Sequence, residues 1–300
     1  MARVGIFTGG RTNQITAPGY RAFLDELRKL GFSEGRNIIY DVREADQDVA
    51  GLVASAAELA RANSDVIVAG GPEAALQAAI AASSTIPIVM IAINYDPLAR
   101  NYIKSLAQPG GNVSGVFLRQ TELAEKQVEL LTQAFPERKN VAMLWDRFSV
   151  DQFAAAERRA KTMGLQVRSL KLEKPPYDFD AALRTLAADG AQMALFLSSP
   201  FFATQSPRIA ELAIQRRLPS MFIFRGYVLD GGLLSYGADI VEMFRQTATY
   251  VAKILRGAKP ADLPVEQPKT FELVVNLKTA KAIGVELPTA ILLRANEVIE

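Results

Sequence analysis

The chain contains neither histidine nor cysteine, and this limits the chemistry that its side chains can perform. Their absence removes cysteine nucleophiles, serine–histidine–aspartate triads, histidine general bases and almost every zinc site. Carboxylates, Lys and Tyr remain, and Glu73 and Asp96 in the first half of the chain could form a carboxylate pair. Helix and turn capping explains these two acids more simply. We therefore expect no catalytic residue, no metal site and no cofactor.

Arginines, aromatic rings and small polar residues instead follow the apolar, strand-like segments. In open α/β sheets, ligands bind at the carboxyl ends of the strands, so these residues are the predicted ligand-binding set. They are Thr8, Gly10, Arg11, Thr12, Gly71, Pro72, Glu73, Asn94, Tyr95 and Asp96 in the first half, and Arg147, Phe148, Ser149, Ser199, Pro200, Phe201, Phe202, Arg225 and Tyr227 in the second.

The residue types in this set favour an aromatic amino acid, or an aromatic or amphipathic carboxylate, over a sugar or a metal ion. Aromatic rings would bury an apolar body, and a few polar groups would fix its orientation. One of Arg11, Arg147 and Arg225 could hold a carboxylate through two hydrogen bonds. Asp96 could receive an ammonium group.

Residues 66–77, VIVAGGPEAALQ, pass from a β-branched run through two glycines into a helical pattern. Gly71 is the expected N-cap and Pro72 the first helical residue. Glu73 meets the helix dipole favourably but would repel a phosphate. Neither GGPEAA nor TGGRTNQ matches the dinucleotide or the P-loop pattern. A carboxylate or a carbonyl is therefore a better ligand for this helix start than a nucleotide.

Short apolar runs alternate with amphipathic helical patterns over most of the chain. The runs lie at residues 3–8, 37–42, 65–69, 87–91 and 112–116, and the pattern restarts with runs at residues 140–145, 165–169, 192–197 and 220–224. Strands that are apolar throughout and joined by helices indicate parallel sheets covered on both faces. The predicted fold class is α/β, with two doubly wound parallel-sheet lobes of four or five strands each.

Extended segments between glycines suggest where the chain passes from one lobe to the other. Residues 108–118 and 230–239 are two such segments, and the proline-rich tail at residues 264–276 supplies a third. The predicted N-terminal lobe is 1–117 plus 237–268, and the C-terminal lobe is 118–236 plus 269–300. Three hinge strands would join the lobes, with the ligand cleft between them.

Composition and charge are those of a globular protein, with 49% apolar and 22% charged residues. Lys and Arg total 34 against 32 for Asp and Glu, and no block of like charge indicates a nucleic-acid partner.

No apolar run reaches the roughly 18 to 20 residues that span a membrane. The first residues lead directly into a core strand without a signal peptide, which fits either a cytosolic protein or a mature form without its export signal.

Several segments resemble the extracytoplasmic substrate-binding proteins of ABC transporters, in the family that includes tryptophan- and tyrosine-binding lipoproteins. The most specific are GGLLSYG at residues 231–237, and LRGAKPADLPVEQP with FELVVNLKTAKAIG at residues 255–284. The resemblance implies a type I periplasmic-binding fold and a periplasmic or extracytoplasmic location. It implies ligand contacts around Gly71–Glu73, Asp96 and Ser199–Phe202. Many relatives carry a hydroxyl residue before the proline, where this chain has Gly71.

The favoured function is capture of a small organic molecule by hinge closure and its delivery to an ABC permease and ATPase. The membrane would be met only through the permease or through a removed signal or lipid anchor. One alternative is a ligand-sensing module of a receptor or regulator. A remote alternative is a doubly wound enzyme that works without His or Cys.

Overall fold

The computed structural model describes residues 1–9, 17–45 and 49–300. The chain divides into two compact units: unit 1 is Met1–Arg119 with Ile240–Lys269, and unit 2 is Gln120–Asp239 with Thr270–Glu300. The chain therefore crosses between units after residues 119, 239 and 269. The sequence placed these crossings after residues 117, 236 and 268.

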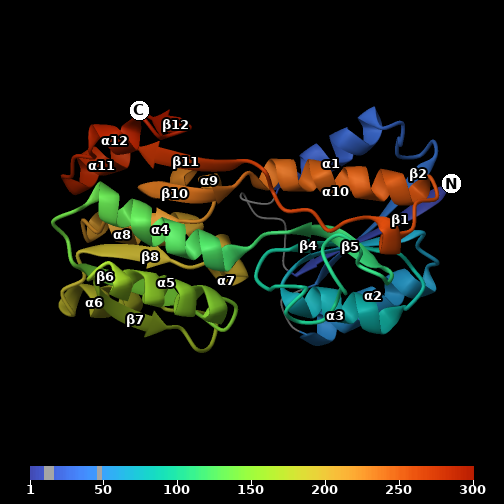
Figure 1. Ribbon diagram of the computed structural model, residues 1–300, viewed down its shortest axis with the longest axis horizontal. Coiled ribbons are helices and arrows are strands. Elements are labelled where there is room, and N and C mark those ends of the chain that lie inside the picture. The colour runs from blue at the N-terminus through green and yellow to red at the C-terminus, as the bar shows by residue number, and fades with distance from the viewer. Residues whose placement is uncertain (10–16, 46–48) are drawn as a thin grey trace. The chain divides into compact units, whose positions relative to one another are not determined.

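Unit 1 contains a sheet of five parallel strands in the order β2-β1-β3-β4-β5 (Figure 1). The strands are β1 (Ala2–Gly9), β2 (Ile38–Ala45), β3 (Val66–Gly71), β4 (Ile88–Ala92) and β5 (Val113–Phe117). Residues of β4 and β5 are buried along their whole length. This is the pattern expected when helices cover both faces of a parallel sheet.

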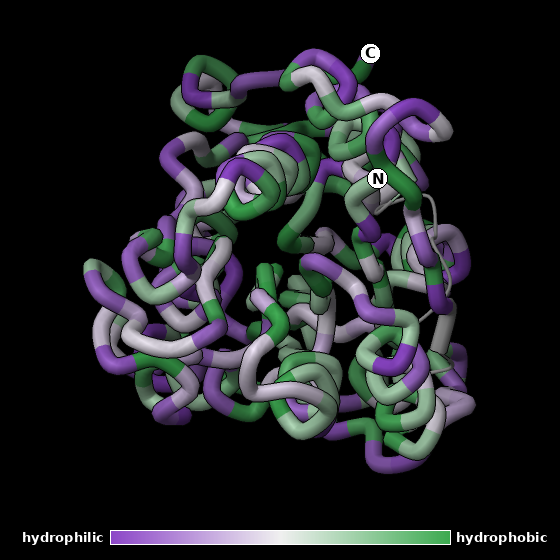
Figure 2. The backbone as a smooth tube through the Cα atoms, turned by 90° about the vertical axis from the view of Figure 1, so that its right-hand side faces the viewer, coloured by the Kyte–Doolittle hydropathy of each residue, from purple (hydrophilic) through white to green (hydrophobic). Residues whose placement is uncertain are grey.

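The helices of unit 1 lie in two layers, α1 with α10 and α2 with α3 (Figure 1). Their bounds are α1 (Ala17–Lys29), α2 (Val49–Arg61), α3 (Glu73–Ala82) and α10 (Ile240–Leu255), followed by the short 3₁₀ helix η1 (Pro260–Asp262). In α1, Phe23 and Leu27 lie one turn apart and are buried, because this face packs inward. Figure 2 shows hydrophilic and hydrophobic residues alternating along the helices.

Unit 2 contains seven strands in the order β12-β11-β10-β9-β8-β6-β7. Their bounds are β6 (Asn140–Trp145), β7 (Gln166–Lys171), β8 (Met193–Phe196), β9 (Ser220–Phe222), β10 (Leu234–Ala238), β11 (Phe271–Asn276) and β12 (Glu297–Ile299). The predicted α/β class is confirmed, but the expectation of four or five all-parallel strands is wrong here. The tail adds β11 and β12, and β11 runs antiparallel to β10, a common addition to a largely parallel sheet.

Unit 2 has eight helices among its residues, all of which are described. They are α4 (Gln120–Ala134), α5 (Val150–Thr162), α6 (Phe179–Ala188), α7 (Pro200–Thr204), α8 (Ser206–Gln215), α9 (Arg225–Leu229), α11 (Leu277–Ile283) and α12 (Thr289–Leu292). The helix expected from Leu277 is confirmed as α11, which Asn276 caps through a hydrogen bond from the Thr279 N–H.

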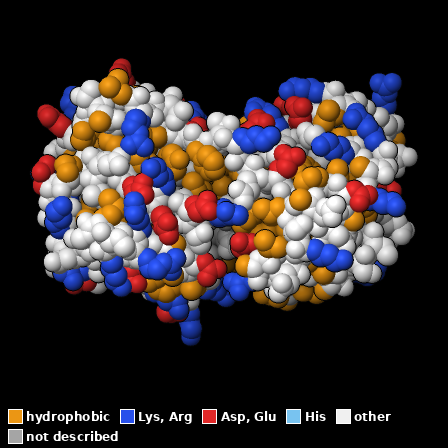
Figure 3. Space-filling model, viewed as in Figure 1, with side chains coloured by type: hydrophobic (Ala, Val, Ile, Leu, Met, Phe, Trp, Pro, Cys, Tyr) orange, Lys and Arg blue, Asp and Glu red, His pale blue; other side chains and the backbone are white. Residues whose placement is uncertain are grey.

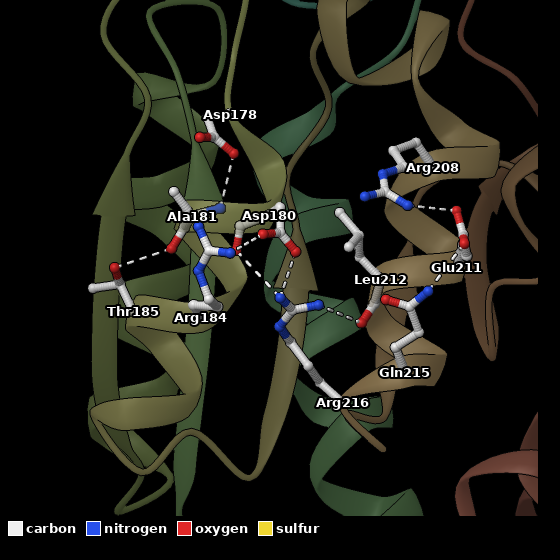
Figure 4. Close-up of polar contacts among 10 residues, drawn as sticks. All are labelled: Asp178, Asp180, Ala181, Arg184, Thr185, Arg208, Glu211, Leu212, Gln215 and Arg216. Carbon is white, nitrogen blue, oxygen red and sulfur yellow. Dashed lines mark hydrogen bonds and ion pairs between the residues drawn. The ribbon is translucent and has the colours of Figure 1, made fainter.

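A polar network ties α6 to α8 on the surface of unit 2 (Figure 4). The Arg216 guanidinium donates to Asp180 Oδ1 at 2.6 Å, and Arg184 pairs with the other carboxylate oxygen. Asp178 caps α6 by accepting the Ala181 N–H at 2.9 Å. The hydrogen bond from Arg216, together with the neighbouring arginine charges, lowers the pKa of Asp180.

Exchange of Asp180 for Asn should therefore reduce stability in a pH-dependent way. Because the folded-state pKa lies below the unfolded value, Asp180 stabilises the fold above the unfolded pKa, and this contribution is lost as the pH falls through the folded pKa. We expect wild type to melt above D180N near neutral pH, and the two to converge as the pH falls below the folded-state pKa of Asp180. Thermal melts across this range test it. D189N, at an exposed aspartate without an ion pair in the described structure, should retain the wild-type pH dependence.

Candidate functional site

Three aromatic rings lie together at the carboxyl edge of the unit 2 sheet. Phe148 follows β6, Tyr177 lies between β7 and α6, and Phe201 is in α7 after β8. The ring centroids of Phe148 and Phe201 are 5.8 Å apart, and those of Tyr177 and Phe201 are 5.6 Å apart. All three side chains are half-buried. We call Phe148, Tyr177 and Phe201 the aromatic wall, because each ring packs on a neighbour and keeps some exposed surface.

Two further rings support this wall from the core. Phe202 is fully buried and Phe179 is 5% exposed, and their rings meet edge to face with centroids 5.2 Å apart. Tyr177 packs edge-on against both. Phe202 belongs to the predicted ligand-binding set, but its burial gives it a supporting position in this structure.

A buried carboxylate, Asp146, lies beside the aromatic wall. Its side chain accepts hydrogen bonds from the Phe148 N–H at 2.9 Å, the Tyr177 hydroxyl at 3.1 Å and the Ser199 hydroxyl at 2.5 Å. The Ser149 hydroxyl lies 3.4 Å from the same carboxylate. Burial raises the pKa of Asp146, and the hydrogen bonds oppose this effect. The predicted residues Ser149 and Ser199 are thus buried partners of a carboxylate.

Arg147 places a positive charge at the exposed side of the wall. Its guanidinium carbon lies 4.9 Å from the centroid of the Phe148 ring, within the range of a cation–π contact. Its side chain is exposed, and no ion pair to it is found among the described residues. Pro200, also in the predicted set, is the first residue of α7, where proline fits a helix start.

The remaining predicted residues of unit 2, Arg225 and Tyr227, have partners elsewhere. Arg225 in α9 donates two hydrogen bonds to Glu297 in β12, at 2.5 and 2.7 Å. This pairing lowers the pKa of Glu297. Tyr227 is 3% exposed and its ring stacks on Phe222 with centroids 4.9 Å apart. Both side chains therefore hold α9 against the sheet.

In unit 1 the helix after β3 begins one residue later than predicted. Strand β3 continues through Gly71, whose φ is +100°, and Pro72 is the N-cap of α3. The expectation that Gly71 caps the helix is therefore wrong, because Gly71 adopts a left-handed conformation that suits glycine at the turn. Glu73 accepts the Tyr102 hydroxyl at 2.7 Å and lies 3.5 Å from Arg100 Nε.

In the segment after β4, the predicted residues Asp96 and Tyr95 make contacts with nearby residues of the same segment. Asp96 Oδ1 accepts the N–H groups of Leu98 and Ala99 at 2.9 and 3.1 Å, and so caps a turn. Tyr95 is 5% exposed and packs edge-on against Tyr102. Burial raises the pKa of Tyr95. Asn94 is half-buried. Gly10, Arg11, Thr12 and the side chain of Thr8 lie outside the described residues.

The predicted set missed Asp146 and Tyr177 in unit 2 and Tyr102 in unit 1. Asp146 directly follows β6, so the rule that ligands gather at strand ends could have included it. Tyr177 lies in the PPYDFD segment several residues beyond β7, and Tyr102 lies in the irregular chain between β4 and β5. Neither tyrosine had a signal in the local pattern.

The surface of the described structure carries charges of both signs. Lys and Arg lie intermixed with Asp and Glu on the face of each unit that Figure 3 shows. Residues 1–9, 17–45 and 49–300 hold no group of three or more acidic side chains that could bind a metal ion. Within the same ranges, every helix is too short or too polar to cross a lipid bilayer.

Comparison with known proteins identifies the family. A family model described as "ABC transporter substrate binding protein" matches residues 17–299. The chain is 26% identical over 270 residues to the "Tyrosine-binding protein" of Clostridioides difficile (strain R20291), covering 89% of this chain and 76% of that protein.

Solved structures agree over nearly the whole chain. A conserved domain protein from Vibrio cholerae has a TM-score of 0.89 at 28% identity, and 99% of each chain is covered. The ABC domain from Streptococcus pneumonia in complex with L-Trp has a TM-score of 0.87 at 25% identity, with the same coverage. The two α/β units thus have the predicted type I periplasmic-binding fold, and the chain belongs to the ABC transporter substrate-binding protein family.

Proposed function

We propose that this protein binds an aromatic amino acid outside the cytoplasmic membrane and delivers it to an ABC permease and its ATPase. The observation that carries the proposal is the aromatic wall with Arg147 beside it. The curated relative is a tyrosine-binding protein and one similar structure holds L-Trp, which supports the same class of ligand. The family is one of solute-binding proteins rather than an enzyme class.

The aromatic wall would contact the ligand's ring, and Arg147 its carboxylate. Offset and edge-to-face aromatic pairs contribute about 0.5 to 1.5 kcal/mol each beyond simple burial, and a guanidinium matches the two oxygens of a carboxylate. Both hydrogen bonds that Asp96 accepts in its turn go to Oδ1, and we propose that its other oxygen receives the ammonium group.

The other predicted residues of unit 1 stay part of the proposal as further ligand contacts. They are Thr8, Gly10, Arg11, Thr12, Gly71, Pro72 and Asn94. A rearrangement about the three chain crossings would accompany binding, since ligands shift proteins toward the state to which they bind best. The family match makes this transport role a better proposal than the ligand-sensing module.

A thermal-shift screen of the purified protein tests the proposal. The panel should hold aromatic amino acids, aromatic carboxylates, aliphatic amino acids, short fatty acids and sugars. A ligand at about 100 times its Kd stabilises the fold by about 2.7 kcal/mol, or a few degrees in Tm. We expect L-tyrosine or L-tryptophan to give the largest shift. A shift with a sugar or an aliphatic amino acid and none with any aromatic compound would overturn the proposal.

A further inference from the structure

Each residue of the aromatic wall is linked by hydrogen bonds to one carboxylate, that of Asp146. Phe148 is connected by its own backbone N–H, and Tyr177 by its phenol hydroxyl. Phe201 is connected through Ser199: its N–H donates to Ser199 Oγ at 3.2 Å, and that hydroxyl donates to Asp146 Oδ2 at 2.5 Å. A single buried side chain therefore joins the segments that follow β6, β7 and β8.

The Asp146 carboxylate is fully buried and has no ion pair among the described residues. Burying an unpaired carboxylate is costly, so such a group needs several good hydrogen bonds. Its neighbours supply them from neutral groups, namely one backbone N–H and the hydroxyls of Ser149, Tyr177 and Ser199. An apolar side chain at position 146 would leave these donors without an acceptor, which is costly for buried groups.

The pattern of donors requires a carboxylate at this position. An ionised carboxylate has two oxygens and about four acceptor sites, whereas an Asn amide has one oxygen and two N–H donors. The Ser199 and Tyr177 hydroxyls both donate to Oδ2. The single oxygen of an Asn at position 146 could therefore accept either from the donors at Oδ1, the Phe148 N–H and the Ser149 hydroxyl, or from the two hydroxyls at Oδ2. The donors at the other position would lose their acceptor.

We propose that Asp146 is a positioning residue that sets ligand affinity by holding the three rings of the aromatic wall in their binding arrangement. This inference rests on the proposed function. Its physical basis is preorganisation: a side chain that is already fixed before binding does not lose conformational freedom when the ligand arrives.

Binding of L-tyrosine to the full-length D146N variant tests the inference. We expect the Kd to rise by about tenfold to a hundredfold, as for hydrogen-bonding groups left without a partner. The control is V141A, a core truncation near the start of strand β6, whose other end Asp146 directly follows. V141A should lower the Tm and leave the Kd within about twofold of wild type. An unchanged Kd in D146N would overturn the inference.

Y177F removes one hydroxyl and keeps the ring, so it remains informative even if D146N does not fold. We expect Y177F to raise the Kd by a few fold, and the effects of Y177F and D146N to be non-additive, because both break the same hydrogen bond. Additive effects on the Kd, or no effect of Y177F, would contradict the inference.

Near-ultraviolet circular dichroism of the unliganded proteins separates the two proposals. Immobilised tyrosine rings give a signal there, and D146N should weaken it while V141A preserves it. If wild type binds none of the aromatic amino acids, the proposed function fails. The dichroism then still decides whether Asp146 orders the rings: a D146N spectrum equal to that of wild type would overturn this role.

Discussion

Replacement of Arg147 by Ala should weaken the binding of L-tyrosine by about 1.5 to 3 kcal/mol, which is roughly tenfold to a hundredfold in Kd. The proposed ligand carboxylate would lose its positively charged partner, while the Phe148 ring beneath the guanidinium remains. Because Arg147 is exposed and makes no ion pair in the described structure, its removal leaves no buried charge behind. Titration calorimetry of wild type and R147A measures the difference.

The chain offers a matched control for this variant. Arg138 lies 5.0 Å above the centroid of Phe135, so it repeats the arginine-over-phenylalanine contact just before β6, at the amino end of the strand. R138A should leave the Kd for L-tyrosine unchanged. Tyramine, which lacks the carboxylate, should bind wild type and R147A equally. An equal loss of tyramine and tyrosine binding, or an equal effect of R138A, would show that Arg147 does not hold the carboxylate.

Replacement of Gly237 by Ala should lower the free energy of unfolding by about 3 kcal/mol or more. Gly237 lies in β10, and a Cβ atom there would be 2.0 Å from the carbonyl oxygen of Ile223. The obstacle is backbone, which cannot move aside as a flexible side chain can. Neighbouring strands would have to separate at this point. Urea-induced unfolding, followed by far-ultraviolet circular dichroism, measures the change.

Gly111→Ala is the control for the glycine prediction. A Cβ atom at Gly111 meets nothing within 4 Å, and its φ is not in the left-handed region. It should leave stability unchanged or raise it by a few tenths of a kcal/mol through the unfolded state. If G237A unfolds at the same urea concentration as wild type, the tight approach of Gly237 to Ile223 is refuted.

Much of the fold could be predicted from the sequence because most of its strands are buried on both faces. Such strands are apolar throughout, and β6 was found with its observed bounds, 140–145. The additional strands β11 and β12 were harder to place, because their pairing depends on where the tail returns to the sheet. Strand direction in the β10–β11 pair likewise follows from tertiary structure and not from local pattern.

The candidate site was only partly predictable, because the burial and pairing of its side chains depend on tertiary structure. The rule that ligands bind at strand ends named Arg147, Phe148 and Phe201, which lie together in the structure, since it needs only the strand positions. It could not distinguish Phe201 from its buried neighbour Phe202. Nor could it show that Arg225 pairs with Glu297, which lies 72 residues further along the chain.

Two glycines of the GGLLSYG segment, Gly232 and Gly237, lie where a larger side chain would not fit. A Cβ atom at Gly232 would lie 2.7 Å from the Phe222 ring and 2.8 Å from the Tyr227 carbonyl oxygen. Gly237, at the other end of the segment, approaches the backbone of Ile223 even more closely. Both glycines therefore allow β10 to pack closely against β9 and its neighbours.

Calorimetric titration of L-tyrosine into the purified protein tests whether the aromatic wall of unit 2 binds an aromatic amino acid. L-Leucine serves as the aliphatic comparison. We expect saturable binding of L-tyrosine, at least about tenfold tighter than that of L-leucine, a difference of about 1.4 kcal/mol. Absence of binding by L-tyrosine, L-tryptophan and L-phenylalanine, or equal affinity for L-leucine, would contradict it.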